Sequence, residues 1–120
     1  MEYIVNINEH NKQVELIAGG YKIDVLGGFG VEMGQFEIKF KHIPSEQVFT
    51  STRVRWPIQG YKFNKRSKRI LSVELDLSGL YEIQFIKPET LGLRESNAFL
   101  FSWFNETVPN KVISVYIHPD

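Results

Sequence analysis

The residues Leu77-Ser78-Gly79-Leu80-Tyr81 join two stretches of alternating apolar and polar residues. Residues 71–77 precede them and residues 81–85 follow them, and both stretches have the period of two that is typical of strands with one buried face. Gly79 is a turn signal between the two stretches, and Tyr81 is the first apolar position of the second stretch. This stretch therefore indicates a fold and not a chemistry.

The spacing of Leu77, Gly79 and Tyr81 resembles the tyrosine corner of Greek-key β-sandwiches. In that motif the chain passes from one sheet to the other, and the phenol hydroxyl bonds to the backbone a few residues upstream. The resemblance implies that Leu77, Gly79 and Tyr81 are structural residues and that Tyr81 anchors the crossing with its polar tip satisfied.

Further alternating or apolar runs extend through the chain and are separated by turn residues. About eight strands are expected, so the predicted fold class is all-β, an antiparallel β-sandwich of Greek-key or jelly-roll type with residues 1–120 in one domain. Besides the two strands around Gly79, the runs are 3–7, 14–18, 21–26, 36–41, 48–56 and 113–117.

Cysteine is absent, which excludes disulfides, thiol catalysis and cysteine metal sites. The first residues have no basic start followed by an apolar run, and no stretch of about 18 apolar residues occurs. We therefore expect no membrane span, and the lack of a visible signal peptide favours the cytoplasm over export. A trimmed export signal would leave the same sequence.

Charge is distributed unevenly along a chain with a formal net charge of zero. Seven of the 14 Lys and Arg residues fall within 53–69, a stretch without any acid, which predicts a basic end on an otherwise acidic body. Such polarity suits head-to-tail contact or an anionic partner. The seven candidate partner-binding residues are Arg53, Arg55, Lys62, Lys65, Arg66, Lys68 and Arg69.

The segment 61–69 mixes aromatic residues with these cations, so three interpretations are open. It could be a solvated hairpin tip or protected edge, a contact for a protein with an acidic face, or a site for single-stranded nucleic acid. A sequence pI of about 6.8 argues against dedicated nucleic-acid binding, which depends on phosphate neutralisation.

Two aromatic residues in the basic stretch suggest a carbohydrate-binding platform as an alternative function. Trp56 precedes Pro57 at the end of a predicted strand, and Tyr61 follows closely, so both rings could stack on a sugar. Trp103 lies in an apolar run and is expected to be buried.

Catalytic and metal-binding patterns are weak. His10, His42 and His118 lie in predicted turns or near the C-terminus without a carboxylate at ligand spacing, so surface positions are expected. The few Asp residues are scattered, and no serine stands in a Gly-x-Ser-x-Gly elbow. We therefore expect no cofactor, no metal and no catalytic residue, with an enzyme built from dispersed residues as a further alternative.

Residues 88–107 form a long apolar connection that fits neither helical nor strand periodicity cleanly. It is expected to hold a short helix or a strand buried on both faces. Either it closes one end of the sandwich, or its 91–104 part is a contact surface.

The tail 79–117, with Gly79-x-Tyr81-x-x-x-Phe85 and a last strand after Lys111, loosely resembles the end of Golgi-dynamics (GOLD) domains, which are β-sandwich interaction modules. The sequence has Ile86-Lys87 where that family has Asp-Asn. Function is accordingly predicted as a non-catalytic interaction or assembly module that uses the basic loop and the apolar crossover to contact a protein partner or a second copy.

Overall fold

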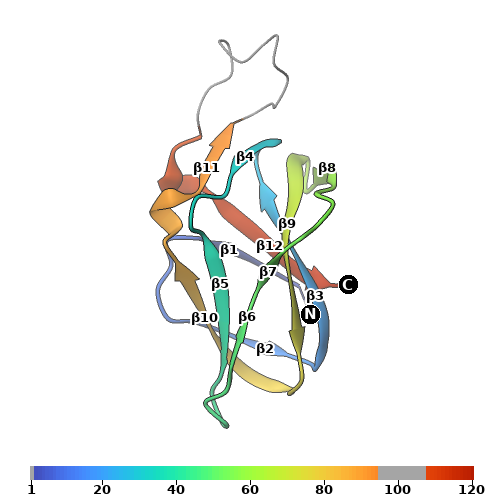
Figure 1. The fold of residues 1–120 in the computed structure, drawn as a ribbon, viewed down its shortest axis with the longest axis vertical. Helices are drawn as coiled ribbons and strands as arrows, with labels where there is room; N and C mark the ends of the chain where they lie inside the picture. Colours follow the sequence, from blue (N-terminus) through green and yellow to red (C-terminus); the bar gives the residue numbers. More distant parts are fainter. Residues whose placement is uncertain (1, 95–107) are drawn as a thin grey trace.

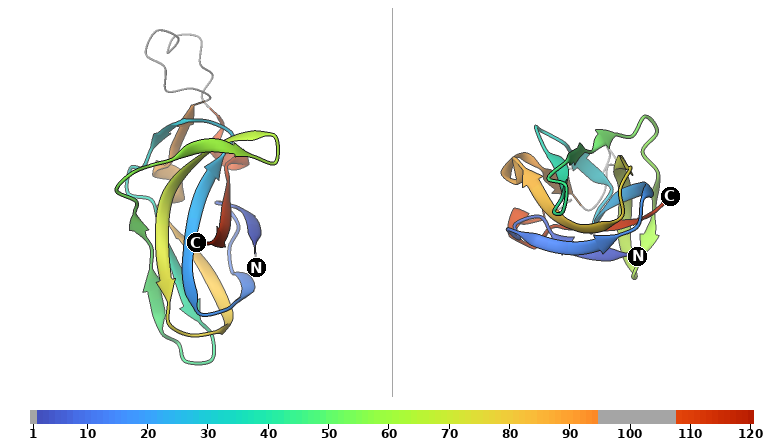
Figure 2. Two further views of the ribbon diagram at one scale, coloured as in Figure 1. Left: turned by 90° about the vertical axis from the view of Figure 1, so that its right-hand side faces the viewer. Right: turned by 90° about the horizontal axis from the view of Figure 1, so that it is seen from below.

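The computed structural model describes residues 2–94 and 108–120. Two antiparallel sheets pack against each other, as Figures 1 and 2 show, and the two layers enclose the apolar core. The predicted class, an all-β antiparallel sandwich, is confirmed.

The larger sheet has six strands and includes β9, which contains the basic residues 65–69 and pairs with three other strands. Along the sheet the order is β1-β12-β3-β9-β7, and β8 also pairs with β9. Its strands are β1 (Tyr3–Asn6), β12 (Ser114–Pro119), β3 (Gly19–Leu26), β9 (Lys65–Leu75), β7 (Thr52–Arg53) and β8 (Gln59–Lys62).

The smaller sheet has four strands in the order β2-β10-β5-β6, and a two-stranded ribbon lies beside it. Within the described ranges, no helix is long and apolar enough to cross a membrane. The remaining elements are β2 (Lys12–Leu16), β10 (Gly79–Ile86), β5 (Glu37–His42), β6 (Val48–Thr50), the ribbon strands β4 (Gly30–Glu32) and β11 (Gly92–Arg94), and 3-10 helices at Pro88–Thr90 and Asn110–Val112.

The core follows the alternation expected from the sequence. Along β9 the side chains of Leu71, Val73 and Leu75 are buried while Glu74 is exposed, and along β5 Ile38 and Phe40 are buried. Burying such side chains contributes about 1.5–3 kcal/mol each, so the period of two explains why these segments pair as sheet layers.

Two neighbouring connections carry the chain between the sheets. One leads from β9 to β10, where the Tyr81 hydroxyl donates a hydrogen bond to the Leu77 carbonyl, as predicted. The other leads from β2 to β3, where the Tyr21 hydroxyl donates to the Ile17 carbonyl at 2.7 Å. Both tyrosine rings are buried, and each backbone bond satisfies the phenol that would otherwise be stranded in the core.

One predicted strand is wrong in its extent. Residues 48–56 do not form a single strand, because the chain changes sheets at Ser51, between β6 and β7. The buried Ser51 side chain accepts a hydrogen bond from the Ile38 amide at 2.9 Å. Its own amide donates to the Ile38 carbonyl at the same distance, 2.9 Å. Ser51 therefore bonds to both backbone polar groups of Ile38 at the point where the chain passes from the smaller sheet to the larger one.

The apolar connection is seen only in part. Leu91 and Leu93 belong to the core, and β11 pairs with β4, so this beginning of the crossover is packing rather than a contact surface. The rest of the predicted 91–104 surface, with Trp103, lies outside the described residues.

Candidate functional site

A hairpin formed by β8 and the beginning of β9 carries most of the residues that the sequence singled out. Lys62 pairs with Lys65, and the two-residue turn between them is Phe63-Asn64. Both turn residues have positive φ, 54° and 61°, as a type I′ hairpin turn requires. Figure 2 shows the hairpin projecting sideways from the sandwich. A phenylalanine in this conformation is unusual, because the left-handed region is unfavourable for bulky side chains.

The hairpin and the loop before it expose large apolar side chains close together in sequence. Trp56 is 77% exposed, Tyr61 71%, and Ile58 and Phe63 56% each. Single exposed apolar residues are common on proteins, but four within eight positions, with Trp and Tyr among them, favour a contact surface. We call residues Arg55–Lys65 the hairpin surface.

The underside of the hairpin is fixed to the outer face of the larger sheet. The Phe63 ring meets Tyr116 edge-on at 5.0 Å between centroids, and Tyr116 stacks on His118 at 4.6 Å. His118 Nε2 lies 3.0 Å from Asp24 Oδ2, and Arg69 Nε lies 3.3 Å from Asp24 Oδ1. Since Arg69 belongs to β9, this chain of contacts begins and ends on the hairpin strands.

The expectation of surface histidines is wrong for two of the three. His118 is buried against Asp24, and buried His42 lies with Nε2 3.0 Å from the Ser78 carbonyl oxygen. His10 is exposed. Asp24 and Ser78 are distant from these histidines in the sequence, so spacing along the chain could not show these contacts, whereas Ser45 Oγ, 2.7 Å from His42 Nδ1, is only three residues away.

The seven predicted cations divide into two groups. Arg69 is bound to Asp24, Lys68 Nζ donates to the Phe29 carbonyl at 3.1 Å, and Arg53 donates to the Gly34 carbonyl at 2.7 Å, so these three are held by the fold. The other four lie on or beside the hairpin surface. They are Arg55, Lys62, Lys65 and Arg66.

Beside the hairpin, a half-buried ring from the β3–β4 connection supports its upper side. Phe29 meets Tyr61 edge-on at 5.8 Å, and the Arg66 guanidinium lies 5.3 Å from the Phe29 ring centroid. The edge contact with Phe29 restricts the orientation of the Tyr61 side chain while Tyr61 stays 71% exposed. This is an arrangement in which an aromatic ring can receive a ligand without first being ordered.

A cavity of about 270 Å³ lies between the hairpin and Asp24, lined also by Tyr61, Lys62 and Arg69. Both Asp24 oxygens are already occupied, by Arg69 and by His118. Burial raises the pKa of the nearby Tyr116 phenol above its usual value. The cluster is therefore built to hold the hairpin, and it offers no nucleophile activated by a base. Among the described residues no group of three His, Asp or Glu side chains could hold a metal ion.

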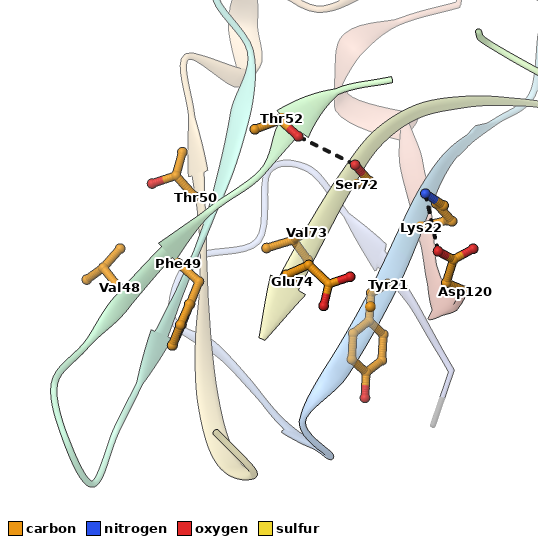
Figure 3. Close-up of a pocket in the computed structure, with 11 residues that line it drawn as sticks. Tyr21, Lys22, Val48, Phe49, Thr50, Thr52, Ser72, Val73, Glu74 and Asp120 are labelled. Carbon is orange, nitrogen blue, oxygen red and sulfur yellow. Dashed lines mark hydrogen bonds and ion pairs between the residues drawn. The ribbon is translucent and has the colours of Figure 1, made fainter. Parts of the chain in front are cut away.

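A larger groove of about 430 Å³ lies at the opposite end of β9 (Figure 3). Val48, Phe49 and Thr50 of β6 line one side, and Ser72, Val73 and Glu74 of β9 line the other, with Tyr21, Lys22 and Asp120 beyond. In the described chain, β6 pairs only with β5, and β9 pairs with β7 only as far as Ser72. Two strand edges therefore border this groove. We call it the β6–β9 groove.

Comparison with protein-family models, with curated proteins and with solved structures gave no match. The tyrosine spacing and the basic, aromatic composition of 53–69 drew attention to two of the features above. The β6–β9 groove was missed, since it arises from where strands stop pairing and has no sequence motif.

Proposed function

We propose that this chain is a non-catalytic interaction module that contacts a protein partner through the hairpin surface. The observation that carries the proposal is the exposure of Trp56, Ile58, Tyr61 and Phe63 within eight consecutive positions. No acid occurs between residues 53 and 69, so the matching partner surface is expected to place carboxylates around an apolar centre.

The construction of the hairpin supports this proposal. Its underside is fixed through Phe63 on Tyr116 and through the ion pairs of Asp24 with Arg69 and His118, while Trp56, Tyr61 and Lys65 remain exposed. Aromatic residues and arginine are the residue types that dominate binding energy at protein interfaces. The resemblance of residues 79–117 to GOLD domains points to the same class of function, but without a family match it adds no support.

The test is capture of partners from an extract of the source cells by the immobilised chain, with quantitative mass spectrometry. The variant Trp56→Ala/Tyr61→Ala/Lys65→Glu removes apolar area and reverses one charge without touching Asp24, Lys68 or Arg69. We expect proteins enriched on the wild type to be lost from this variant. A matched control, Lys39→Glu/Lys41→Glu, changes two cations on β5 in the other sheet and should retain them.

Equal capture by all three proteins would contradict the proposal, since binding would then not involve the hairpin. The melting temperatures of the variants are measured alongside, because loss of binding in an unfolded variant would be uninformative. Trp56 and Tyr61 are largely exposed and Lys65 lies in solvent, so each substitution is expected to change stability by about 0.5 kcal/mol or less.

Carbohydrate binding is the second candidate, and it rests on the residues Trp56 and Tyr61, which are 77% and 71% exposed. A glycan array probed with the wild type and with Trp56→Ala tests it directly. A glycan bound by the wild type and lost in Trp56→Ala would favour this alternative. A protein partner that survives excess glycan would favour the interaction module.

A further inference from the structure

Strand β9 carries opposite charges at its two ends. Its first five residues include Lys65, Arg66, Lys68 and Arg69, whereas Glu74 is the residue before its last, Leu75, and Asp76 follows the strand. At about 3.3 Å per residue, Lys65 and Glu74 lie roughly 30 Å apart along the strand. The hairpin surface and the β6–β9 groove are thus the two ends of one rigid element, as Figure 1 shows for β8 and the lower part of β9.

The end opposite the hairpin is acidic. It comprises residues 15–20, 43–48, 73–81 and 119–120, and we call it the corner end because both sheet-crossing connections lie there. The Asp120 amide donates to the Gly20 carbonyl at 2.9 Å, which places the last residue in this group. Within these ranges there is no Lys or Arg, although Lys22 lines the adjoining groove and pairs with Asp120 at 3.4 Å. The acids of the corner end, all exposed, are Glu15, Glu46, Glu74, Asp76 and Asp120.

The corner end also matches the hairpin surface in its apolar side chains. Val48 is 48% exposed at the rim of the β6–β9 groove, and Ile17 is 57% exposed on the β2–β3 connection. Figure 3 shows Phe49 between β6 and the Val73 and Glu74 side chains of β9, with Tyr21 beyond, whereas Val48 lies on the outer side of β6. An aromatic ring entering there would meet Phe49 and Val73 beside the hydroxyl groups of Thr50, Thr52 and Ser72. The charged residues that line the groove are Glu74, Asp120 and Lys22.

We infer that the partner of the hairpin surface is a second copy of this chain, docked head to tail. Tyr61 and Phe63 of one copy lie in the β6–β9 groove of the next, and Lys62 and Lys65 face the acids Glu74 and Asp76. This inference rests on the proposed function, and it names the occupant from the opposite charge and the matching apolar exposure of the two ends.

Head-to-tail contact has two structural consequences. The two surfaces lie at opposite ends of β9, so a copy cannot fill its own groove, and a pair of bound copies still has one hairpin and one groove unoccupied. Such a heterologous contact continues into rings or open chains rather than stopping at a dimer. Because charges of opposite sign meet at exposed sites, salt should weaken it.

Two blocked variants test the inference by analytical ultracentrifugation. The hairpin-blocked variant is Tyr61→Ser/Lys62→Gln/Lys65→Gln, and the groove-blocked variant is Val48→Ser/Glu74→Gln/Asp76→Asn. The wild-type chain is expected to exceed its monomer mass of 14.0 kDa increasingly with concentration, and less so in high salt. Each variant alone should associate at least roughly tenfold more weakly.

Mixing the variants supplies the decisive measurement, because one intact hairpin and one intact groove remain. A 1:1 complex of twice 14.0 kDa that does not grow further supports the inference. A wild-type monomer at every concentration overturns it, as does a groove-blocked variant that still associates like the wild type. In both cases the proposed function survives if the capture experiment shows a different partner that needs the hairpin. Lys87→Gln/Lys111→Gln, which changes two exposed cations that belong to neither surface, is the control and should associate normally.

Discussion

The corner end and the hairpin end of this sandwich both combine residues of positive φ with aromatic side chains, but the rings are buried at the corner end and exposed at the hairpin end. At the corner end, glycines take the unusual backbone conformations, Gly19 with φ 149° and Gly79 with φ 141°, and the tyrosines that follow are buried and bonded. At the hairpin end, Phe63 and Asn64 take positive φ values themselves, and the aromatic rings stay in solvent. The corner end is arranged for stability, whereas the hairpin end keeps exposed area at some cost in backbone conformation.

The two connections of the corner end support one another. The Ser78 hydroxyl accepts a hydrogen bond from the Ala18 amide at 2.8 Å, and His42 Nε2 lies 3.0 Å from the Ser78 carbonyl oxygen. Residue 78 of one connection is thereby bonded to the other connection and to β5. Substitutions at the corner end should consequently lower stability far more than equally small substitutions on the hairpin.

The largest effect is expected from Gly79→Ala. Its φ of 141° is strongly disfavoured for a residue with a side chain, and the new Cβ would lie 3.0 Å from His42 Nε2. We expect a loss of about 2–4 kcal/mol in the free energy of unfolding, measured by urea denaturation.

Gly19→Ala is the matched control. Its φ is equally unfavourable, but a Cβ there meets no atom within 4 Å, so only the conformational term of about 1–2 kcal/mol should be lost. Equal losses at both glycines would show that contact with His42 contributes nothing.

The next effect is the loss of one hydroxyl. Tyr81→Phe leaves the Leu77 carbonyl without its partner beside a fully buried ring, and should cost about 1–3 kcal/mol. Tyr21→Phe removes the bond to the Ile17 carbonyl and a second bond that the hydroxyl accepts from the Ile17 amide at 3.1 Å. Because Ile17 is 57% exposed, water can replace the hydroxyl, and the cost should be about 1 kcal/mol or less. Calorimetry of both variants decides the order, and a larger loss for Tyr21→Phe would contradict it.

Sequence reasoning found one of these connections and overlooked its twin. Ile17-Ala18-Gly19-Gly20-Tyr21 repeats the spacing of Leu77, Gly79 and Tyr81, with an exposed Ile in place of the half-buried Leu. The repeat was available as a signal. The alternating strands were equally predictable, because a period of two directly reflects which face is buried.

The candidate site was less predictable, since its geometry depends on contacts between distant segments. Asp24 looks like an outward residue of a strand, yet β9 and β12 bring Arg69 and His118 to it, and the cluster is buried. Likewise the sequence could not separate Lys65, which lies in solvent, from Lys68, which is bound to the Phe29 carbonyl. Composition identified the segment 53–69, but only the folded structure separates the cations that are bonded to the rest of the protein from those that are exposed.

At the hairpin end, Phe63→Asn is expected to change stability by less than about 1 kcal/mol. Asparagine tolerates positive φ, so relief of the backbone cost offsets the lost edge contact with Tyr116. Thermal denaturation measures the stability, and sedimentation measures self-association, which should weaken. A large destabilisation with intact association would mean that Phe63 is only an anchor for the hairpin.

The last prediction concerns the ionisation of the buried phenols, which has no effect on stability near neutral pH and lowers it only in alkaline solution. Burial raises the pKa of Tyr21 and Tyr81 above the ordinary value of about 10, although the backbone hydrogen bonds act in the opposite direction. In the unfolded chain these phenols ionise first, so the stability they contribute is fully present below about pH 10 and is lost as pH rises through their folded values. The unfolding free energy measured between pH 8 and 11 should fall at the alkaline end, and that of Tyr21→Phe/Tyr81→Phe should fall less steeply despite its lower starting value.

If both proteins show the same alkaline slope, the loss of stability arises elsewhere. The buried Tyr116 phenol is then the next group to replace, because burial raises its pKa as well. That outcome would move the pH-sensitive contact from the corner end to the underside of the hairpin.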